Sequence, residues 1–169
     1  MIIWFTGISG VGKSTLGREF FKSFKLKHKN SIFVDGDEFR KLFRNDLKYS
    51  LRDRNKNAIR LISFVKFLDR QKINVILAAN LTSKRNREWC KKNLRNYHEI
   101  FITVDLKNLL KRDKKNIYSL RNKKNVVGFG IPFYKTNTAF LNINNNFSKK
   151  KLFQNIDKIY KIINKKDIY

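Results

Sequence analysis

The chain has 169 residues, 41% of them hydrophobic, a size and composition that suit one globular domain with a buried core. Its single cysteine excludes an internal disulfide framework and a multi-cysteine zinc site, and it lacks the run of ~20 apolar residues that a membrane span needs. The net charge of +26 is spread along a chain rich in Asn, Ile and Phe, which indicates compositional bias and argues against nucleic acid as the main partner. The apolar start over 1–7 lacks the features of a signal peptide, so we expect a cytoplasmic protein.

Short apolar runs alternate with longer amphipathic stretches along the chain. The predicted strands cover about 1–6, 31–35, 74–79, 100–105 and 139–143. The predicted helices cover about 14–27, 50–71, 83–94, 106–115 and 151–164. The buried face of the second helix is expected to carry Ile59, Ile62, Val65 and Leu68, and that of the last helix Leu152, Ile156, Ile159 and Ile163. This alternation predicts an α/β fold, a parallel sheet flanked by helices in a single domain over 1–169.

The most specific motif is the run Gly-Ile-Ser-Gly-Val-Gly-Lys-Ser from Gly7 to Ser14, which satisfies G-x-x-x-x-G-K-[ST] at every required position. It lies between a predicted strand and a predicted helix, where backbone N–H groups and a helix N-terminus bind phosphate. We expect Lys13 to bridge the β- and γ-phosphates of ATP and the Ser14 hydroxyl to bind Mg²⁺. The predicted nucleotide-binding residues are Gly7, Ser9, Gly10, Gly12, Lys13, Ser14 and Thr15.

A phosphate loop of this kind occurs in kinases, switch GTPases and motor ATPases. The base-selecting Asn-Lys-x-Asp of a switch GTPase is absent from the sequence, and 169 residues leave little room for the extra modules of a motor. A small-substrate kinase with a P-loop NTPase-type sheet is therefore the best fit.

Two carboxylates, Asp35 and Asp37, directly follow the second predicted strand. Because the carboxyl ends of parallel strands face the ligand crevice, these side chains should point toward the phosphate loop. Structural alternatives remain open: Asp37 as the N-cap of a short helix over 38–44, and Asp35 as a turn residue. Arg40, Arg54 and Asn57, farther along the chain, have the alternative of solvated helix positions.

The other residues with reactive side chains have simpler interpretations. His28 and His98 have no partner at metal-ligand spacing, which favours surface or strand-edge positions. Cys90 is expected to face the core from a helix and not to act as a nucleophile.

Several motifs in order make the sequence similar to the adenylylsulfate kinase (APS kinase) family over about 1–143. They are Asp35-Gly36-Asp37-Glu38-Phe39-Arg40, Asp46-Leu47-Lys48-Tyr49-Ser50, Asp53-Arg54-Asn55-Lys56-Asn57-Ala58-Ile59-Arg60, Asp113-Lys114-Lys115-Asn116-Ile117-Tyr118 and Val126-Val127-Gly128-Phe129. The resemblance implies phosphorylation of a ribose 3′-hydroxyl on a nucleotide with an unusual anionic end group. It also suggests a homodimer.

The resemblance implies a role for each matched residue. Asp37 would orient or deprotonate the hydroxyl, and Asp35 would help to hold Mg²⁺ through water. Lys115, which could equally be a surface lysine, would close over the transferring phosphoryl group with a basic lid loop at about 122–137. The implied acceptor-binding residues are Asp35, Arg40, Arg54, Asn57, Asn80, Leu81, Val126 and Gly128.

The sequence departs from the family at the two aromatic positions that stack on the acceptor adenine, which here are Asn80 and Val126. Stacking on an aromatic side chain contributes ~1 to 3 kcal/mol per base, so adenine should bind less well. The Asn80 amide offers a donor and an acceptor, which suits a smaller base read by hydrogen bonds. These departures favour a branch similar to APS kinases that phosphorylates cytidine diphosphoramidate in bacterial capsule decoration.

Three alternatives to that acceptor kinase remain at this point. The first is an adenylylsulfate kinase that makes 3′-phosphoadenylylsulfate. The second, from a different class, is a nucleic-acid-stimulated P-loop ATPase. A non-catalytic binding protein is the third, and the intact Lys13, Ser14 and Asp37 argue against it.

Overall fold

The order of strands and helices follows the predicted alternation, with one short helix after the second strand that was predicted only as an alternative over 38–44. The computed structural model describes residues 1–81, 83–112, 118, 124–131, 133, 139–146 and 149–166. Its strands are β1 (Ile2–Thr6), β2 (Ser31–Asp35), β3 (Asn74–Ala78), β4 (Tyr97–Thr103) and β5 (Leu141–Asn144). Its helices are α1 (Lys13–Lys27), α2 (Gly36–Leu42), α3 (Leu51–Arg70), α4 (Lys84–Asn93), α5 (Leu106–Lys111) and α6 (Lys149–Lys166).

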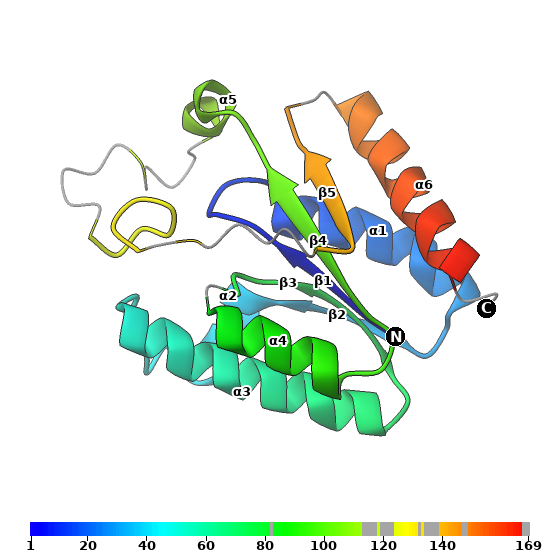
Figure 1. The fold of residues 1–169 in the computed structure, drawn as a ribbon, viewed down its shortest axis with the longest axis horizontal. Coiled ribbons are helices and arrows are strands. Elements are labelled where there is room, and N and C mark those ends of the chain that lie inside the picture. Colours follow the sequence, from blue (N-terminus) through cyan, green and yellow to red (C-terminus); the bar gives the residue numbers. More distant parts are fainter. Residues whose placement is uncertain are drawn as a thin grey trace.

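The strands form one parallel sheet in the order β2-β3-β1-β4-β5 (Figure 1). The central strand β1 pairs with β3 on one side and with β4 on the other. All five residues of β1 are buried, which explains why this strand is a continuous apolar run and not an alternating pattern. The predicted α/β fold class is confirmed.

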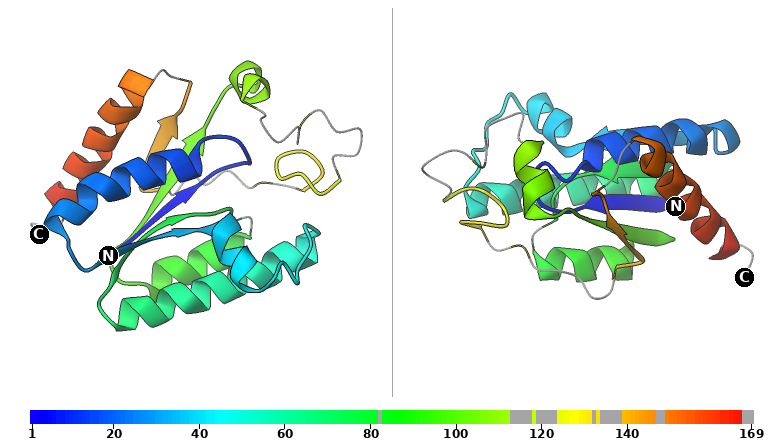
Figure 2. Two further views of the ribbon diagram at one scale, coloured as in Figure 1. Left: turned by 180° about the vertical axis from the view of Figure 1, so that it is seen from behind. Right: turned by 90° about the horizontal axis from the view of Figure 1, so that it is seen from above.

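Helices cover both faces of the sheet, α1 and α6 on one face and α3 and α4 on the other (Figure 2). Because side chains alternate along a strand, successive residues of β1 enter the two different cores. On one side Phe20 and Phe24 of α1 pack with Ile159 of α6. On the opposite side Trp4 of β1 packs with Leu61 of α3.

The buried face of α3 differs from the prediction at one residue. Ile62, Val65 and Leu68 are buried, but Ile59 is 56% exposed. A step of three residues turns the helix ~60° less than one full turn, so side chains spaced three apart move progressively around the helix. Ile59, at one end of the predicted series, therefore faces away from the core.

In the described part of the chain, no helix is long and apolar enough to cross a membrane.

Strand β4 begins at Tyr97 and ends at Thr103, earlier than predicted at both ends. His98 therefore lies inside the sheet, 8% exposed, with its ring 4.4 Å from that of Phe140, and its prediction as a surface or strand-edge residue is wrong. His28 ends α1 and stacks on Phe24 at 4.2 Å between ring centres. The prediction that Cys90 faces the core is confirmed, because its side chain is completely buried.

A buried ion pair links α4 to β4. Arg87 of α4 and Glu99 of β4 lie 3.4 Å apart, with side chains 6% and 1% exposed. Burial raises the pKa of Glu99, whereas the Arg87 charge acts in the opposite direction and favours the carboxylate. The Arg87 guanidinium also lies 5.0 Å from the centre of the Phe133 ring, which stacks on Phe101 of β4. The pair thereby ties α4 and Phe133 of the predicted lid to the sheet.

We predict that Arg87→Met lowers the free energy of unfolding by about 3 to 5 kcal/mol, since it leaves the Glu99 charge buried without its partner. Urea unfolding of purified protein at pH 7 measures the change. Lys84→Met is the matched control, because the Lys84–Glu88 pair on the same helix has side chains 81% and 64% exposed. This exposed pair should change stability by about 1 kcal/mol or less. Equal effects of the two substitutions would contradict the prediction.

Candidate functional site

The phosphate loop joins the carboxyl end of β1 to α1 and forms one wall of a cavity of about 700 Å³. The loop residues and first-turn residues that line this cavity are Ser9, Gly10, Gly12, Lys13, Ser14 and Thr15. Gly10 and Gly12 have φ angles of 76° and 97°, a region that side chains rarely allow. Gly7 does not line the cavity. A Cβ there would lie 2.4 Å from the Ile102 carbonyl oxygen, so Gly7 lets the chain pass β4 closely.

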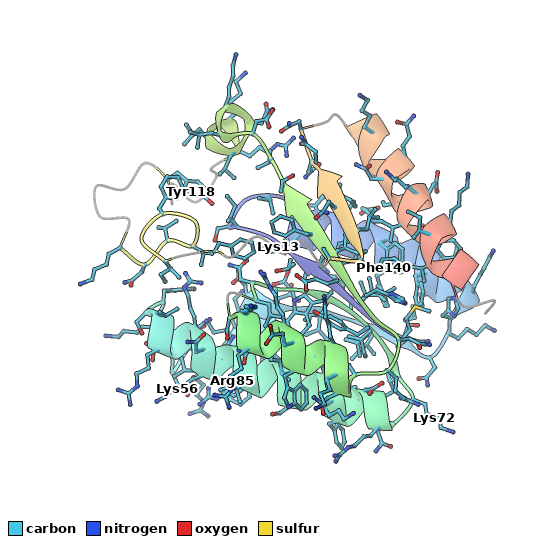
Figure 3. All side chains as sticks on the ribbon, in the orientation of Figure 1. Lys13, Lys56, Lys72, Arg85, Tyr118 and Phe140 are labelled. Carbon is cyan, nitrogen blue, oxygen red and sulfur yellow. The ribbon has the colours of Figure 1, made fainter. Side chains whose placement is uncertain are left out.

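Lys13 lies in the cavity with its ammonium group held by the loop itself. Its Nζ donates a hydrogen bond to the Ile8 carbonyl at 2.8 Å. A flexible lysine stem allows Nζ to exchange this carbonyl for phosphate oxygens. Figure 3 shows Lys13 and Tyr118 toward the end of the sheet at which the strand arrows point, and Lys72 at the other end.

Asp35 and Asp37 reach the same cavity from the end of β2. Asp35 is the N-cap of α2, because its Oδ1 accepts hydrogen bonds from the N–H groups of Asp37 at 2.8 Å and Glu38 at 3.4 Å. The alternative that Asp37 caps this helix is therefore wrong. Gly36 allows a close approach to β3, since a Cβ at this position would lie 2.7 Å from the Ala79 Cβ.

Arg40 and Arg54 form the cationic side of the cavity, with the ring of Tyr49 near both. Their guanidinium carbons lie 5.0 and 5.2 Å from the centre of that ring. Arg40 is 6% exposed and donates to two backbone carbonyls at 3.0 and 3.1 Å, so it is not a solvated helix residue. Arg54 donates to the carbonyls of Tyr49 at 3.0 Å and Asn125 at 2.9 Å. Burial lowers the pKa of Arg54, and the Arg40 charge lowers it further.

The remaining wall combines amides with apolar side chains. Asn57, which is 7% exposed, lines the cavity with Ala58 and Leu61 of α3 and with Asn80 and Val126. Thus Asn57 is not a solvated helix residue either.

Asn80 projects into this cavity just beyond β3. Among the described residues its buried Oδ1 has no hydrogen-bond partner. The indole N–H of Trp4 donates to the Ala79 carbonyl at 3.1 Å and so fixes the chain immediately before Asn80.

Two predicted acceptor-binding residues do not line the cavity. Leu81 is completely buried in the core beneath α3 and α4. Gly128 packs against Ile8, whose Cγ2 would lie 2.9 Å from a Cβ at this position. Lys115 and the lid residues at 122, 123, 132 and 134–137 lie outside the described residues.

Residues 124–131 of the predicted lid form a hydrogen-bonded turn. The Gly128 N–H donates to the Ile131 carbonyl at 2.8 Å, and the Ile131 N–H donates to the Val126 carbonyl at 3.0 Å. This turn places Asn125 and Val126 at the cavity.

Four cavity residues with polar or charged side chains were not predicted as site residues: Tyr49, Arg112, Tyr118 and Asn125. Tyr49 and Tyr118 belong to motifs that carry the family resemblance, so their position in those motifs was an available signal. Arg112 and Asn125 carry no comparable signal, and only the folded chain brings them to the phosphate loop.

The donor set allows a hard cation that is held mostly by its ligand. In the described ranges no cluster of three or more His, Cys, Asp or Glu side chains could hold a metal ion alone. Ser14 and Asp35 nevertheless line one cavity. Mg²⁺ typically takes one or two protein oxygens together with phosphates and waters, so these residues fit it.

The chain matches proteins of one family along most of its length. A model of the family described as adenylylsulphate kinase matches residues 1–144. The cytidine diphosphoramidate kinase of Campylobacter jejuni is 37% identical over 95% of this chain and 94% of its own length. The adenylyl-sulfate kinase of Buchnera aphidicola is 33% identical over 70% of this chain and 58% of its own length.

Solved structures show the same fold. The APS kinase of Mycobacterium tuberculosis, in complex with AMPPNP and APS, superimposes with a TM-score of 0.80 at 24% identity, covering 96% of both chains. The shikimate kinase of Aquifex aeolicus gives a TM-score of 0.61 at 17% identity over 99% of both chains.

We predict that Cys90 in the folded protein does not react with a thiol reagent at pH 8. Burial raises the pKa of this thiol to about 12, with a further contribution from Glu99, so the thiolate that would react is scarce. Spectrophotometric labelling with a disulfide reagent should show no release in native buffer and one thiol per chain in 6 M guanidinium. Rapid labelling of the native protein would contradict this prediction and reopen a nucleophilic role.

Proposed function

Because the chain belongs to the adenylylsulphate kinase family and is a phosphotransferase, we propose that it transfers the γ-phosphoryl group of ATP to the ribose 3′-hydroxyl of cytidine diphosphoramidate. The observation that carries this proposal is the single cavity that contains the phosphate loop, Asp37 and the two arginines Arg40 and Arg54. A donor triphosphate and an anionic acceptor can therefore meet in one site.

The phosphate loop binds the donor. Backbone N–H groups of the loop and the start of α1 bind the β-phosphate, and Lys13 moves from the Ile8 carbonyl to the β- and γ-phosphates. Ser14 and Asp35 would hold Mg²⁺ beside the phosphates, since both line the cavity and the Asp35 cap of α2 uses Oδ1 only. When bound, Mg²⁺ supplies positive charge against the phosphate oxygens.

Asp37 and the arginines bind the acceptor. Asp37 orients the 3′-hydroxyl and accepts its proton, while Arg40 and Arg54 pair with the anionic diphosphoramidate end. An anion between these guanidinium groups would also offset their mutual repulsion, which lowers the pKa of Arg54. Phosphoryl transfer requires mainly positioning and charge neutralisation, and we propose Lys115 as a further cation for that purpose.

Asn80 and Val126 support a pyrimidine acceptor. The buried Oδ1 of Asn80 has no protein partner among the described residues, and an amino group on the acceptor base would relieve the cost of leaving it unpaired. The aliphatic Val126 provides no aromatic face for a purine, and Ala58 and Leu61 complete an apolar wall. Adenylylsulfate is the alternative acceptor in the same class.

The cellular role follows from the acceptor. We propose that the product enters the phosphoramidate decoration of a capsular polysaccharide, in the cytoplasm where ATP is available. The homodimer that the family resemblance implies stays a prediction.

We predict that the protein phosphorylates cytidine diphosphoramidate with ATP and Mg²⁺ in a steady-state assay, and that Asp37→Asn lowers kcat about 100-fold or more by removing the general base. The KM for ATP should stay near the wild-type value. Glu38→Gln is the matched control, since Glu38 is an exposed carboxylate beside Asp37 that does not line the cavity.

Other outcomes distinguish the alternatives. Efficient turnover of APS without turnover of the cytidine compound would replace the proposed acceptor. ATP hydrolysis that rises with DNA or RNA and falls steeply with salt would favour the ATPase instead.

We predict that Asn80→Leu, which keeps the side-chain size and removes the amide, raises the KM for the cytidine acceptor about tenfold, the effect of one lost hydrogen bond to a buried group. The KM for ATP should not change. Asn142→Leu on β5 is the control, because Asn142 is exposed and does not line the cavity. An unchanged acceptor KM in Asn80→Leu would show that Asn80 does not read the base.

A further inference from the structure

Two hydrogen bonds tie carbonyl groups of the phosphate loop to distant parts of the chain. The described residues contain no cis peptide bonds. In a trans peptide the carbonyl oxygen and the N–H of the next residue point in opposite directions within one plane. A partner that holds a loop carbonyl therefore fixes the direction of the following N–H, which points away from that partner.

The first bond comes from Tyr118. Its hydroxyl donates to the carbonyl of Ser9, across 109 positions of sequence. Tyr118 is 2% exposed, and its ring lies 5.1 Å from that of Phe129 between centres. A Cβ on Gly10 would lie 3.6 Å from the Tyr118 ring. The ring therefore lies against the Ser9–Gly10 peptide, whose carbonyl accepts the hydrogen bond from the Tyr118 hydroxyl.

The second bond comes from Asn145, which follows β5. Its Nδ2 donates to the carbonyl of Val11 at 2.7 Å, across 134 positions. The backbone of Asn145 is fixed separately, because its N–H donates to Thr103 at 2.7 Å and its carbonyl accepts from Arg112 at 2.6 Å. The side chain is packed tightly against the loop, since a Cβ on Gly12 would lie 2.5 Å from Nδ2.

The two peptides held in this way are those that precede the positive-φ glycines, Gly10 and Gly12. Glycine visits positive and negative φ with similar ease, so these peptides could rotate at little cost if nothing held them. The Tyr118 and Asn145 bonds select one orientation of each peptide before any ligand arrives. Lys13 holds the Ile8 carbonyl as well, but it must leave that carbonyl to reach phosphate.

We propose that Tyr118 and Asn145 are positioning residues that orient the N–H groups of Gly10 and Gly12 toward the phosphates of the nucleotide. Neither side chain needs to touch the phosphates in this role. The proposal also links the phosphate loop to the chain that leads into the lid, through Tyr118, and to the end of β5, through Asn145. It rests only on the nucleotide-binding half of the proposed function, and its test requires no acceptor.

The test compares the affinities of purified variants for AMPPNP with Mg²⁺ and for inorganic tripolyphosphate by calorimetric titration. Tyr118→Phe removes only the hydroxyl, and Asn145→Leu removes the donor at similar size. We expect each substitution to lower the affinity for both ligands about 3- to 10-fold, the range for the loss of one neutral hydrogen bond. The double variant should weaken the binding of both ligands by about the product of the two single effects, since the two hydrogen bonds hold different peptides.

Tyr160→Phe is the matched control for the first variant. Tyr160 lies in α6 and packs on Phe20 and Phe24, in the same core as Tyr118, and its buried hydroxyl has no hydrogen-bond partner among the described residues. It should bind both ligands like the wild type.

Wild-type affinity of Tyr118→Phe for tripolyphosphate would overturn the proposal for the Ser9–Gly10 peptide, and wild-type affinity of Asn145→Leu would do so for Val11–Gly12. Weaker binding that is matched by an equal loss in Tyr160→Phe would show a general packing effect and would also overturn it. Wild-type protein that binds AMPPNP but phosphorylates no nucleotide would instead contradict the proposed function and leave this proposal intact.

Discussion

The site depends on one constraint of the sheet: three parallel strands end at the same level. Phe5 of β1 and Asp35 of β2 are both paired in register with Ala78 of β3. The loops that leave these strands therefore begin side by side. β3 lies between the other two, so Asn80 emerges between the phosphate loop and the carboxylates at 35 and 37. A slip of any strand by one residue would turn its side chains to the opposite face and separate these loops.

Charge in the cavity is better matched to two anionic ligands than to an empty site. Lys13, Arg40, Arg54 and Arg112 all line it, against the carboxylates of Asp35 and Asp37. The arginines are held by backbone carbonyls, which orient them without neutralising them. Guanidinium groups fixed in this way lose little conformational entropy when they bind an oxyanion. The high net charge of the whole chain adds a favourable potential for polyphosphate ligands but identifies no separate partner.

The departures from the family cluster on the acceptor side of the cavity. The phosphate loop satisfies its motif at every position, whereas the two positions that carry aromatic rings in APS kinases are Asn80 and Val126 here. Both line the cavity, at the end of β3 and on the turn at the start of the described lid segment. This distribution supports the proposal of a different acceptor base with an unchanged donor.

The sequence by itself determined the fold class, the strand and helix order, the phosphate loop and the carboxylates beside it. These features are local: apolar periodicity, a contiguous motif and a strand end can each be read from neighbouring residues. The drift of the buried stripe on α3 past Ile59 and the burial of His98 were missed, because they depend on what packs against each element. The tertiary structure alone decided that Leu81 enters the core, that Arg112 and Asn125 line the cavity, and that Tyr118 and Asn145 hold carbonyls of the phosphate loop. The Tyr118 and Asn145 bonds join residues more than a hundred positions apart, and no local pattern in a single sequence encodes which of many buried polar groups will meet.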